Sequence, residues 1–141
     1  MGFLIDTNIL SELQKGERAD IGVKTWYASC KPDDLYLSVL VVGEIRQGIE
    51  RLRRRDPVQA ERLEQRLADV LSIMQGRILA ITENIAQRWG SINSPDPFPV
   101  IDGLLAATAL EHDLTLVTRN VRDVKRSGVV LLNPFSDQTG A

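Results

Sequence analysis

Cysteine and histidine are nearly absent from this sequence, which has one of each, Cys30 and His112, in 141 residues. A single cysteine excludes a disulfide within the chain and is typical of a protein kept in a reducing compartment. The two residues are also too few for a zinc site, whose ligands are mainly cysteine and histidine. The sequence therefore predicts neither a disulfide scaffold nor a zinc protein.

Long apolar runs are absent as well. No stretch approaches the roughly 20 residues that a membrane-spanning helix needs. Near the N-terminus, Asp6 interrupts the apolar residues where a signal peptide would be continuous. We therefore expect a cytoplasmic protein without a membrane segment.

Neither sign of charge is in excess, because 17 basic residues stand against 19 acidic ones and the formal net charge is −2. The apolar fraction of 43% and the charged fraction of 26% are ordinary for a globular protein, and the length suits one domain. This balance does not exclude a nucleic-acid substrate, since bound divalent cations can supply positive charge at a phosphate.

Aromatic residues make up only 5% of the chain. Trp26, Tyr27 and Trp89 are expected in the core or in a dimer interface. Phe98 lies in the proline-rich stretch 94–99, which cannot be helical throughout. We expect Phe98 to be the most exposed of the four.

Short apolar runs alternate with helical patterns, which predicts a parallel sheet covered by helices on both faces. The expected strands cover residues 3–5, 35–37, 78–81, 115–117 and 129–132. Thr7 or Asn8 is expected to cap the first helix, and residues 38–75 to form a long helical hairpin. The fold class is α/β, with three layers (α/β/α), a central parallel sheet of about four to five strands and a protruding hairpin. Residues 1–133 are expected to form one domain and residues 134–141 a loose C-terminal tail.

Acidic residues occur where the pattern predicts strand ends and helix starts. Asp6 directly follows the first strand, Asp102 opens a late helix, and Asp123 comes shortly after the fourth strand. Glu44 lies about two turns into the helix after the second strand, where an inward-facing side chain reaches the same edge. Ligands of open α/β sheets bind at this edge, beyond the carboxyl ends of the strands.

Carboxyl groups crowded at one edge raise each other's pKa unless a cation lies between them. Mg²⁺ or Mn²⁺ is suited to that position, because both prefer oxygen ligands. Such an ion lowers the pKa of a bound water and offsets charge on a phosphodiester. Taken singly, each acid is explained as a turn residue, a helix cap or a solvated side chain. Only their joint placement predicts a hydrolytic metal site.

Four segments, spread over nearly the whole chain, contain these acids. They are Leu4-Ile5-Asp6-Thr7-Asn8, Ser38 with Gly43-Glu44-Ile45 and Gly48, Asp102 through Ala109, and Leu116 through Asp123. In order and spacing they resemble the PIN-domain ribonucleases, and within them the toxins of the virulence-associated protein C (VapC) kind. The resemblance implies a PIN-like fold and a Mg²⁺-dependent endoribonuclease that acts as a toxin. It also implies a homodimer, an RNA substrate and a cognate antitoxin protein as partners.

The resemblance further implies roles for particular residues. The expected metal-binding and catalytic acids are Asp6, Glu44 and Asp102. The fourth acidic position falls on either Asn120 or Asp123, of which Asp123 is favoured as the metal ligand and Asn120 as a residue that positions the site. Thr7 and Thr118 are expected to hydrogen-bond the acids or a metal-bound water.

Two other functions fit parts of the pattern. A PIN-type nuclease of RNA maturation or DNA processing would keep the same acids and act on a different substrate. A receiver-like signalling domain would also bind Mg²⁺ through an acidic cluster. That domain needs a lysine after a late strand, where this chain has Arg119, so the sequence favours a nuclease.

A run of arginines marks the end of the third expected helix. Its members are Arg46, Arg51, Arg53, Arg54 and Arg55, with Arg62 and Arg66 on the next helix. A solvated helix end, with nearby glutamates as partners, explains such a run. A surface that contacts phosphates or an acidic partner explains it equally well. The sequence leaves both explanations open.

Overall fold

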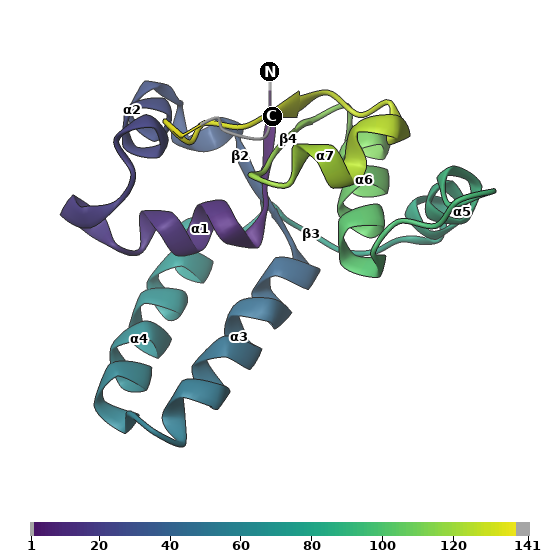
Figure 1. The fold of residues 1–141 in the computed structure, drawn as a ribbon. Coiled ribbons are helices and arrows are strands. Elements are labelled where there is room, and N and C mark those ends of the chain that lie inside the picture. Colours follow the sequence, from purple (N-terminus) through teal and green to yellow (C-terminus); the bar gives the residue numbers. More distant parts are fainter. Residues whose placement is uncertain (1, 138–141) are drawn as a thin grey trace.

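Residues 2–137 are described by the computed structural model, and a five-stranded parallel sheet lies at their centre (Figure 1). The strands are β1 (Phe3–Ile5), β2 (Leu35–Ser38), β3 (Ile78–Leu79), β4 (Thr115–Val117) and β5 (Leu131–Leu132). Their order in space is β3-β2-β1-β4-β5, so β1 is the central strand. The expected parallel sheet is confirmed. The edge strands β3 and β5 are shorter than their apolar runs, because each has a neighbour on one side only.

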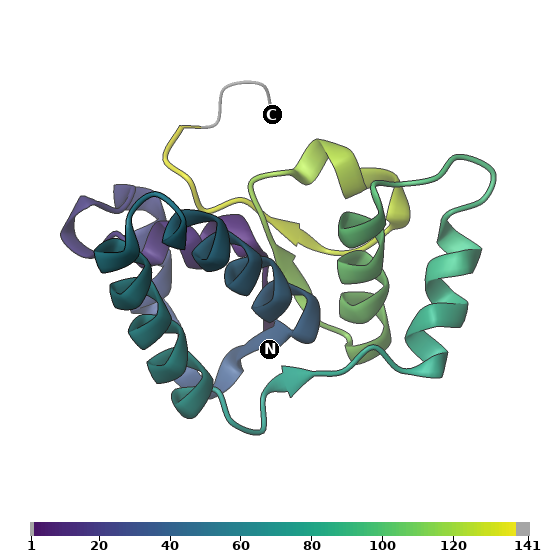
Figure 2. The ribbon, with the colours of Figure 1, turned by 90° about the horizontal axis from the view of Figure 1, so that it is seen from below.

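Helices cover both faces of this sheet. They are α1 (Thr7–Leu13), α2 (Ile21–Ser29), α3 (Val39–Arg53), α4 (Pro57–Ile73), α5 (Glu83–Ile92), α6 (Val100–His112) and α7 (Val121–Val124). Short 3-10 helices are η1 (Gly16–Arg18), η2 (Pro32–Asp34) and η3 (Lys125–Ser127). Figure 2 shows α1–α4 on one side of the sheet and α5–α7 on the other, which is the expected three-layer arrangement. Within residues 2–137, no helix has the length and apolar character needed to cross a membrane.

The core lies against the inner strands, whose residues are buried on both faces. Leu4 of β1 and Leu116 of β4 are 0% and 1% exposed, as expected for a parallel sheet between two helical layers. The inward residues of α6 are small, and Ala106, Ala107 and Ala109 are all fully buried, so this helix can approach its neighbours closely. The packing fixes the carboxyl ends of the strands relative to the starts of the helices.

The α3–α4 hairpin projects from the sheet, as the sequence predicts (Figure 1). Ser38 caps α3 by accepting a hydrogen bond from the Leu40 N–H, and Asp56 caps α4 by accepting one from the Gln59 N–H. Ion pairs join the exposed sides of the two helices. Their members are Arg46 and Arg53 of α3 with Glu50 of α3 and Glu61 and Glu64 of α4.

Two details of the expected elements are wrong. The cap of α1 is Asp6, whose side chain accepts from the Thr7 N–H, and not Thr7 or Asn8. Phe98 was expected to be exposed, but its side chain is buried, with 4% exposed. The Arg126 guanidinium covers its ring at 3.9 Å, and the Phe98 N–H donates to Asn93 Oδ1 at 2.7 Å. Contacts from distant residues therefore bury this part of the proline-rich stretch.

The chain after β5 is held against α2 and is not loose as far as residue 137. Phe135 is 5% exposed, and the Ser136 N–H and Oγ both donate to the Asp20 carboxylate, at 2.9 and 2.5 Å. A Cβ at Gly22 would lie 2.3 Å from the Pro134 carbonyl oxygen, so only glycine permits this approach. Residues 138–141 lie outside the described residues, and the domain boundary at residue 133 stays a prediction.

Candidate active site

Asp6 lies at the carboxyl end of the central strand and is 5% exposed. Ile5 of β1 pairs in register with Val117 of β4, so the residues that follow them, Asp6 and Thr118, come together. Thr118 Oγ1 donates to Asp6 Oδ2 at 2.7 Å, and the Thr7 N–H donates to Asp6 Oδ1 at 2.7 Å. Burial raises the pKa of Asp6, these two hydrogen bonds oppose the rise, and the charge of Glu44 adds to it.

Asn8 also belongs to this site, although the sequence pattern indicated it only as a possible helix cap. Its Nδ2 donates to Asp6 Oδ2 at 3.3 Å and to Thr118 Oγ1 at 3.4 Å, and its Oδ1 accepts from the Arg119 N–H at 3.2 Å. Asn8 thereby ties the start of α1 to the segment after β4. Asn8 stands two residues after Asp6, the acid at the strand end, and this spacing could have indicated that Asn8 belongs to the site.

Glu44 lies at the same edge of the sheet, in α3, the helix that follows the neighbouring strand β2. Because β2 pairs with β1 in parallel, the helix α3 starts beside the start of α1. Thr7 Oγ1 donates to Glu44 Oε1 at 2.5 Å. The expectation that Thr7 and Thr118 hydrogen-bond the acids is thus confirmed, with Glu44 and Asp6 as the respective acceptors.

Asp102 lies in the first turn of α6, the helix that leads into β4. A helix that precedes a parallel strand runs opposite to it, so the start of α6 lies at the carboxyl edge of the sheet. The pKa of Asp102 is raised to about 6, by burial first and then by the negative charges of Asp6, Asp123 and Glu44. The structure therefore brings Asp102 within electrostatic reach of the three other acids.

Asp123 and Asn120 occupy the segment after β4. Asp123 is exposed on α7, and its charge raises the pKa of Asp102. Asn120 takes part through its backbone: its N–H donates to Thr118 Oγ1 at 3.0 Å, and its carbonyl accepts from the Asp123 N–H at 3.1 Å. The geometry thus favours Asp123 as the fourth acid and Asn120 as a positioning residue, and both roles stay predictions.

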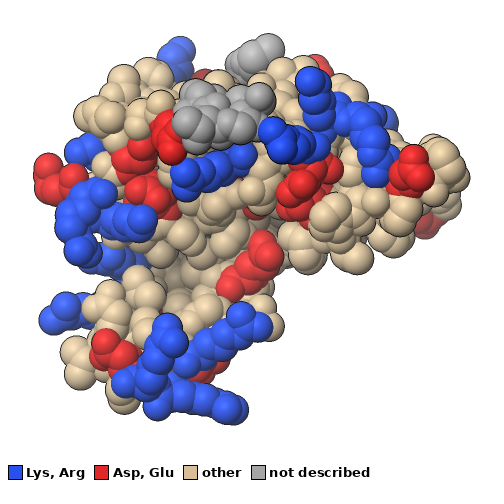
Figure 3. Space-filling view, viewed as in Figure 1, with Lys and Arg blue, Asp and Glu red and all other residues tan. Residues whose placement is uncertain are grey.

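The carboxylates at this edge of the sheet have no lysine or arginine partner among the described residues. Within the described chain, no lysine or arginine forms an ion pair with Asp6, Glu44, Asp102 or Asp123. Figure 3 shows acidic atoms beside the hollow between the hairpin and the body of the molecule. Hard carboxylate oxygens are the donors that Mg²⁺ and Mn²⁺ prefer, so the residues present fit such an ion. As the side chains stand, residues 2–137 contain no group of three acids, histidines or cysteines already arranged to hold one metal ion.

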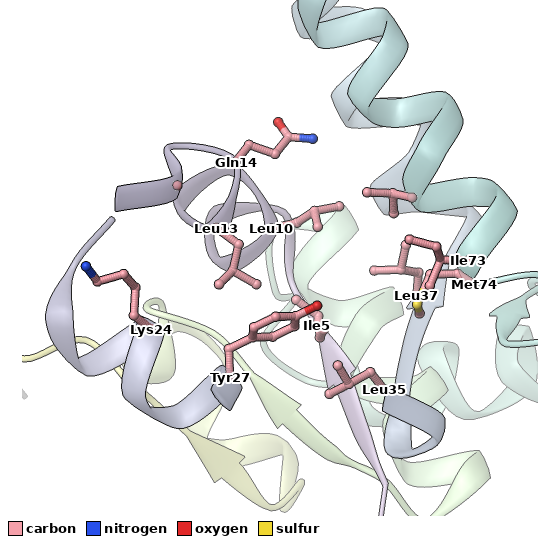
Figure 4. Close-up of a pocket in the computed structure, with 12 residues that line it drawn as sticks. Ile5, Leu10, Leu13, Gln14, Lys24, Tyr27, Leu35, Leu37, Ile73 and Met74 are labelled. Carbon is pink, nitrogen blue, oxygen red and sulfur yellow. The ribbon is translucent and has the colours of Figure 1, made fainter. Parts of the chain in front are cut away.

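An apolar pocket of about 370 Å³ lies beside the acids and not among them (Figure 4). Leu10 and Leu13 of α1 face Tyr27 of α2, Ile73 of α4 and Met74, the C-cap of α4, across it. Its walls contain no acid, so it does not provide hydrolytic chemistry. We assign the candidate active site to the sheet edge.

Comparisons with known proteins agree with this fold. A family model described as the PIN domain matches residues 3–127. The chain belongs to the PIN-domain family, and the resemblance found in the sequence is confirmed.

Particular relatives are similar over nearly their full length. Toxin FitB of Neisseria gonorrhoeae is 35% identical, over 95% of this chain and 99% of that protein. VapC ribonuclease Y4jK of Sinorhizobium fredii is 30% identical, over 94% of this chain and 96% of that protein. The crystal structure of FitAcB from Neisseria gonorrhoeae has a TM-score of 0.86 and 32% identity, over 94% of this chain and 97% of that chain. A toxin–antitoxin complex from Klebsiella pneumoniae has a TM-score of 0.72 and 27% identity, over 95% of this chain and 98% of that chain.

Proposed function

We propose that this protein is a metal-dependent endoribonuclease and the toxin of a type II toxin–antitoxin pair. One observation carries the nuclease proposal: Asp102 has its pKa raised to about 6 partly by three other acids, and none of the four has a cationic partner in the described chain. Carboxylates left in this way are costly for a fold unless a cation joins them. The relative named a VapC ribonuclease supports RNA as the substrate.

The residues that would hold Mg²⁺ or Mn²⁺ are Asp6, Glu44, Asp102 and Asp123. When bound, the ion would supply an activated water and offset charge on the phosphodiester. Thr118 and the Thr7 N–H fix the Asp6 carboxylate, so this acid is oriented before the ion arrives. Asn120 would act as a positioning residue, because its backbone connects Thr118 to Asp123.

A protein partner is the second part of the proposal. The chain is similar to a protein named a toxin, and a toxin made inside a cell needs a partner that silences it. We propose a cognate antitoxin that covers the acidic groove, with a basic side chain to neutralise it. The apolar pocket offers such a partner surface to bury, since Tyr27 and Ile73 at its rim are 47% and 68% exposed. We further propose a homodimer in the cytoplasm, whose mass light scattering would measure.

RNA cleavage by the purified protein tests the nuclease proposal. We expect cleavage with Mg²⁺ or Mn²⁺, none with EDTA, and none with Asp6→Asn under either metal. A single-stranded DNA of the same sequence tests the alternative of a DNA-processing nuclease. Equal cleavage in the metal, EDTA and Asp6→Asn reactions would contradict a metal-dependent mechanism.

A further inference from the structure

Four of the five arginines on and just after α3 form two sets that face opposite ways. Arg46 and Arg53 are seven residues apart and share one helix face, and both pair with Glu64 on α4. Arg51 is seven residues after Glu44, so it lies on the face of that acid, about two turns further along α3. Arg55 directly follows Arg54, the C-cap of α3, whose backbone is still helical.

The second set is exposed and has no acidic partner. Arg51 and Arg55 are both exposed, and neither forms an ion pair with an acid of residues 2–137. Arg46 and Arg53 together use the carboxylates of Glu50, Glu61 and Glu64. Figure 3 shows basic atoms gathered over the far end of the hairpin. A helix C-terminus favours cations, but this effect fades within one turn.

The helix surface between Glu44 and Arg51 is open. Gly48 lies on this face, and an added Cβ there would meet no atom within 4 Å. Gln47 beside it is also exposed. An extended chain could therefore lie along α3 from the acidic edge to the arginines without meeting a bulky side chain.

We propose that this face of α3, defined by Glu44, Gly48, Arg51 and Arg55 and named here the α3 track, binds the phosphate backbone of single-stranded RNA on one side of the cleaved bond. The inference rests on the proposed function. Arginine presents a planar fork of donors that matches a phosphate. Arg51 lies about 10 Å from Glu44 along the helix axis, too far to neutralise the acid and near enough to hold a following phosphate of the same strand.

An acidic protein segment is the competing occupant of the track. RNA is favoured because the track is continuous with the candidate active site at Glu44. A strand held there for hydrolysis must leave along a neighbouring surface, and it carries a negative charge at every nucleotide. The α3 track begins at one of the acids and carries two exposed cations, Arg51 and Arg55, that form no ion pair within residues 2–137.

Salt-dependent binding tests the track directly. The probe is a mixed-sequence single-stranded RNA of about 12 nucleotides, within the site sizes of such proteins, bound to protein that also carries Asp6→Asn to prevent cleavage. Arg51→Gln with Arg55→Gln should lower the slope of log affinity against log salt by about 1.4, because each phosphate contact contributes about 0.7. Arg18→Gln with Arg62→Gln is the matched control, since both side chains are exposed and unpaired in the described chain.

Cleavage by protein with intact acids gives a second readout. On the long RNA, the Arg51/Arg55 variant should raise KM about tenfold and leave kcat unchanged, which is the signature of lost uniform binding. On a dinucleotide, whose only phosphodiester is the cleaved bond and which has no following phosphate for Arg51 to hold, the variant and its control should match the parent. Thermal melting confirms that all variants fold equally well.

Equal salt slopes and equal KM values for the two double variants would overturn the inference. Loss of binding to an acidic partner protein, with RNA binding intact, would overturn it in favour of the competing occupant. If the parent cleaves RNA while the Arg51/Arg55 variant behaves as its control, only the α3 track fails. If the parent neither binds nor cleaves RNA with Mg²⁺ or Mn²⁺, the proposed function fails and the track with it.

Discussion

In the helical hairpin, Glu50 and Glu64 lie beside Arg46 and Arg53, and hydrogen bonds from these arginines hold the pKa of both glutamates below the usual value. At the sheet edge, burial and neighbouring acids raise the pKa of Asp6 and Asp102 instead. Both regions concentrate carboxylates within one small domain. The hairpin provides the balancing charge from its own chain, whereas no lysine or arginine of the described residues pairs with the acids of the sheet edge.

This difference separates structural acids from functional ones. An acid whose charge is balanced within the fold stabilises the fold and needs no further partner. An acid whose pKa is raised by burial and by like charges makes the empty site less stable, and such strain is found where a ligand binds. Replacing one acid from each region by its amide is therefore informative.

The largest effect is expected on catalysis. Asp102→Asn should reduce Mg²⁺-dependent RNA cleavage at least about a hundredfold, because even residues that only orient a metal ligand are worth roughly ten- to a hundredfold. Glu64→Gln removes the same charge from the hairpin and should leave cleavage within about twofold of the parent. Initial rates at saturating Mg²⁺ measure both. Similar losses in the two variants would remove the distinction between the regions.

A smaller loss is expected when the support of Asp6 is removed. Thr118→Val deletes the hydroxyl that donates to Asp6 at 2.7 Å and should weaken metal binding about tenfold, the range for groups that orient a ligand. Thr108→Val is the matched control, since Thr108 is also buried but donates to the Leu104 carbonyl in α6. Mn²⁺ titrations of both variants make the comparison. Equal affinities would mean that Thr118 only supports the fold.

The pH dependence of stability should also distinguish the regions. The pKa of Asp102 rises from 3.8 to about 6 on folding, so the folded chain binds more protons than the unfolded chain between these values. This stabilising term is present below 3.8 and is lost as the pH rises through about 6. In EDTA above that pH, Asp102→Asn should melt a few degrees higher than the parent. Mg²⁺ should raise the melting temperature of the parent only, and a parent as stable as the variant in EDTA would contradict this account.

The smallest effect is expected in the hairpin itself. Glu64→Gln leaves Arg46 and Arg53 with fewer acidic partners, and the pKa of Glu64 is lowered in the folded chain, so its contribution is present at neutral pH and lost on acidification. The pairs are exposed, so the melting temperature should fall by no more than a few degrees, and less in high salt. Differential scanning calorimetry in low and high salt measures this. A large, salt-independent loss would show that the pairs are more than a surface network.

The sequence located Asp6 because this acid directly follows a short apolar run. It located Glu44 and Asp102 because both fall in helices expected to begin at the edge where parallel strands present their carboxyl ends. It did not predict Phe98 as buried, because that depends on Arg126, a residue far along the chain. It named Thr7 or Asn8 as the cap of α1, because aspartate, threonine and asparagine cap almost equally well.

The arginine run also shows that the sequence pattern does not predict contacts between distant residues. Helix periodicity separates Arg46 and Arg53 from Arg51, but which set meets α4 depends on how the two helices pack. Only the fold shows that Glu64 faces Arg46 and Arg53. Asp123, already favoured over Asn120 by the resemblance, also raises the pKa of Asp102 through its charge, and the choice between the two residues stays a prediction. Local pattern predicted the candidate residues, and tertiary contacts sorted them.

Calorimetric titration of Mn²⁺ or Mg²⁺ into chelator-treated protein tests the central claim most directly, because it requires neither RNA nor a partner. We expect saturable binding by the parent and by Glu64→Gln, and at least a tenfold weaker affinity for Asp102→Asn. Equal affinities for all three proteins, or no binding by the parent, would contradict the proposal that the acids of the sheet edge converge on a divalent cation.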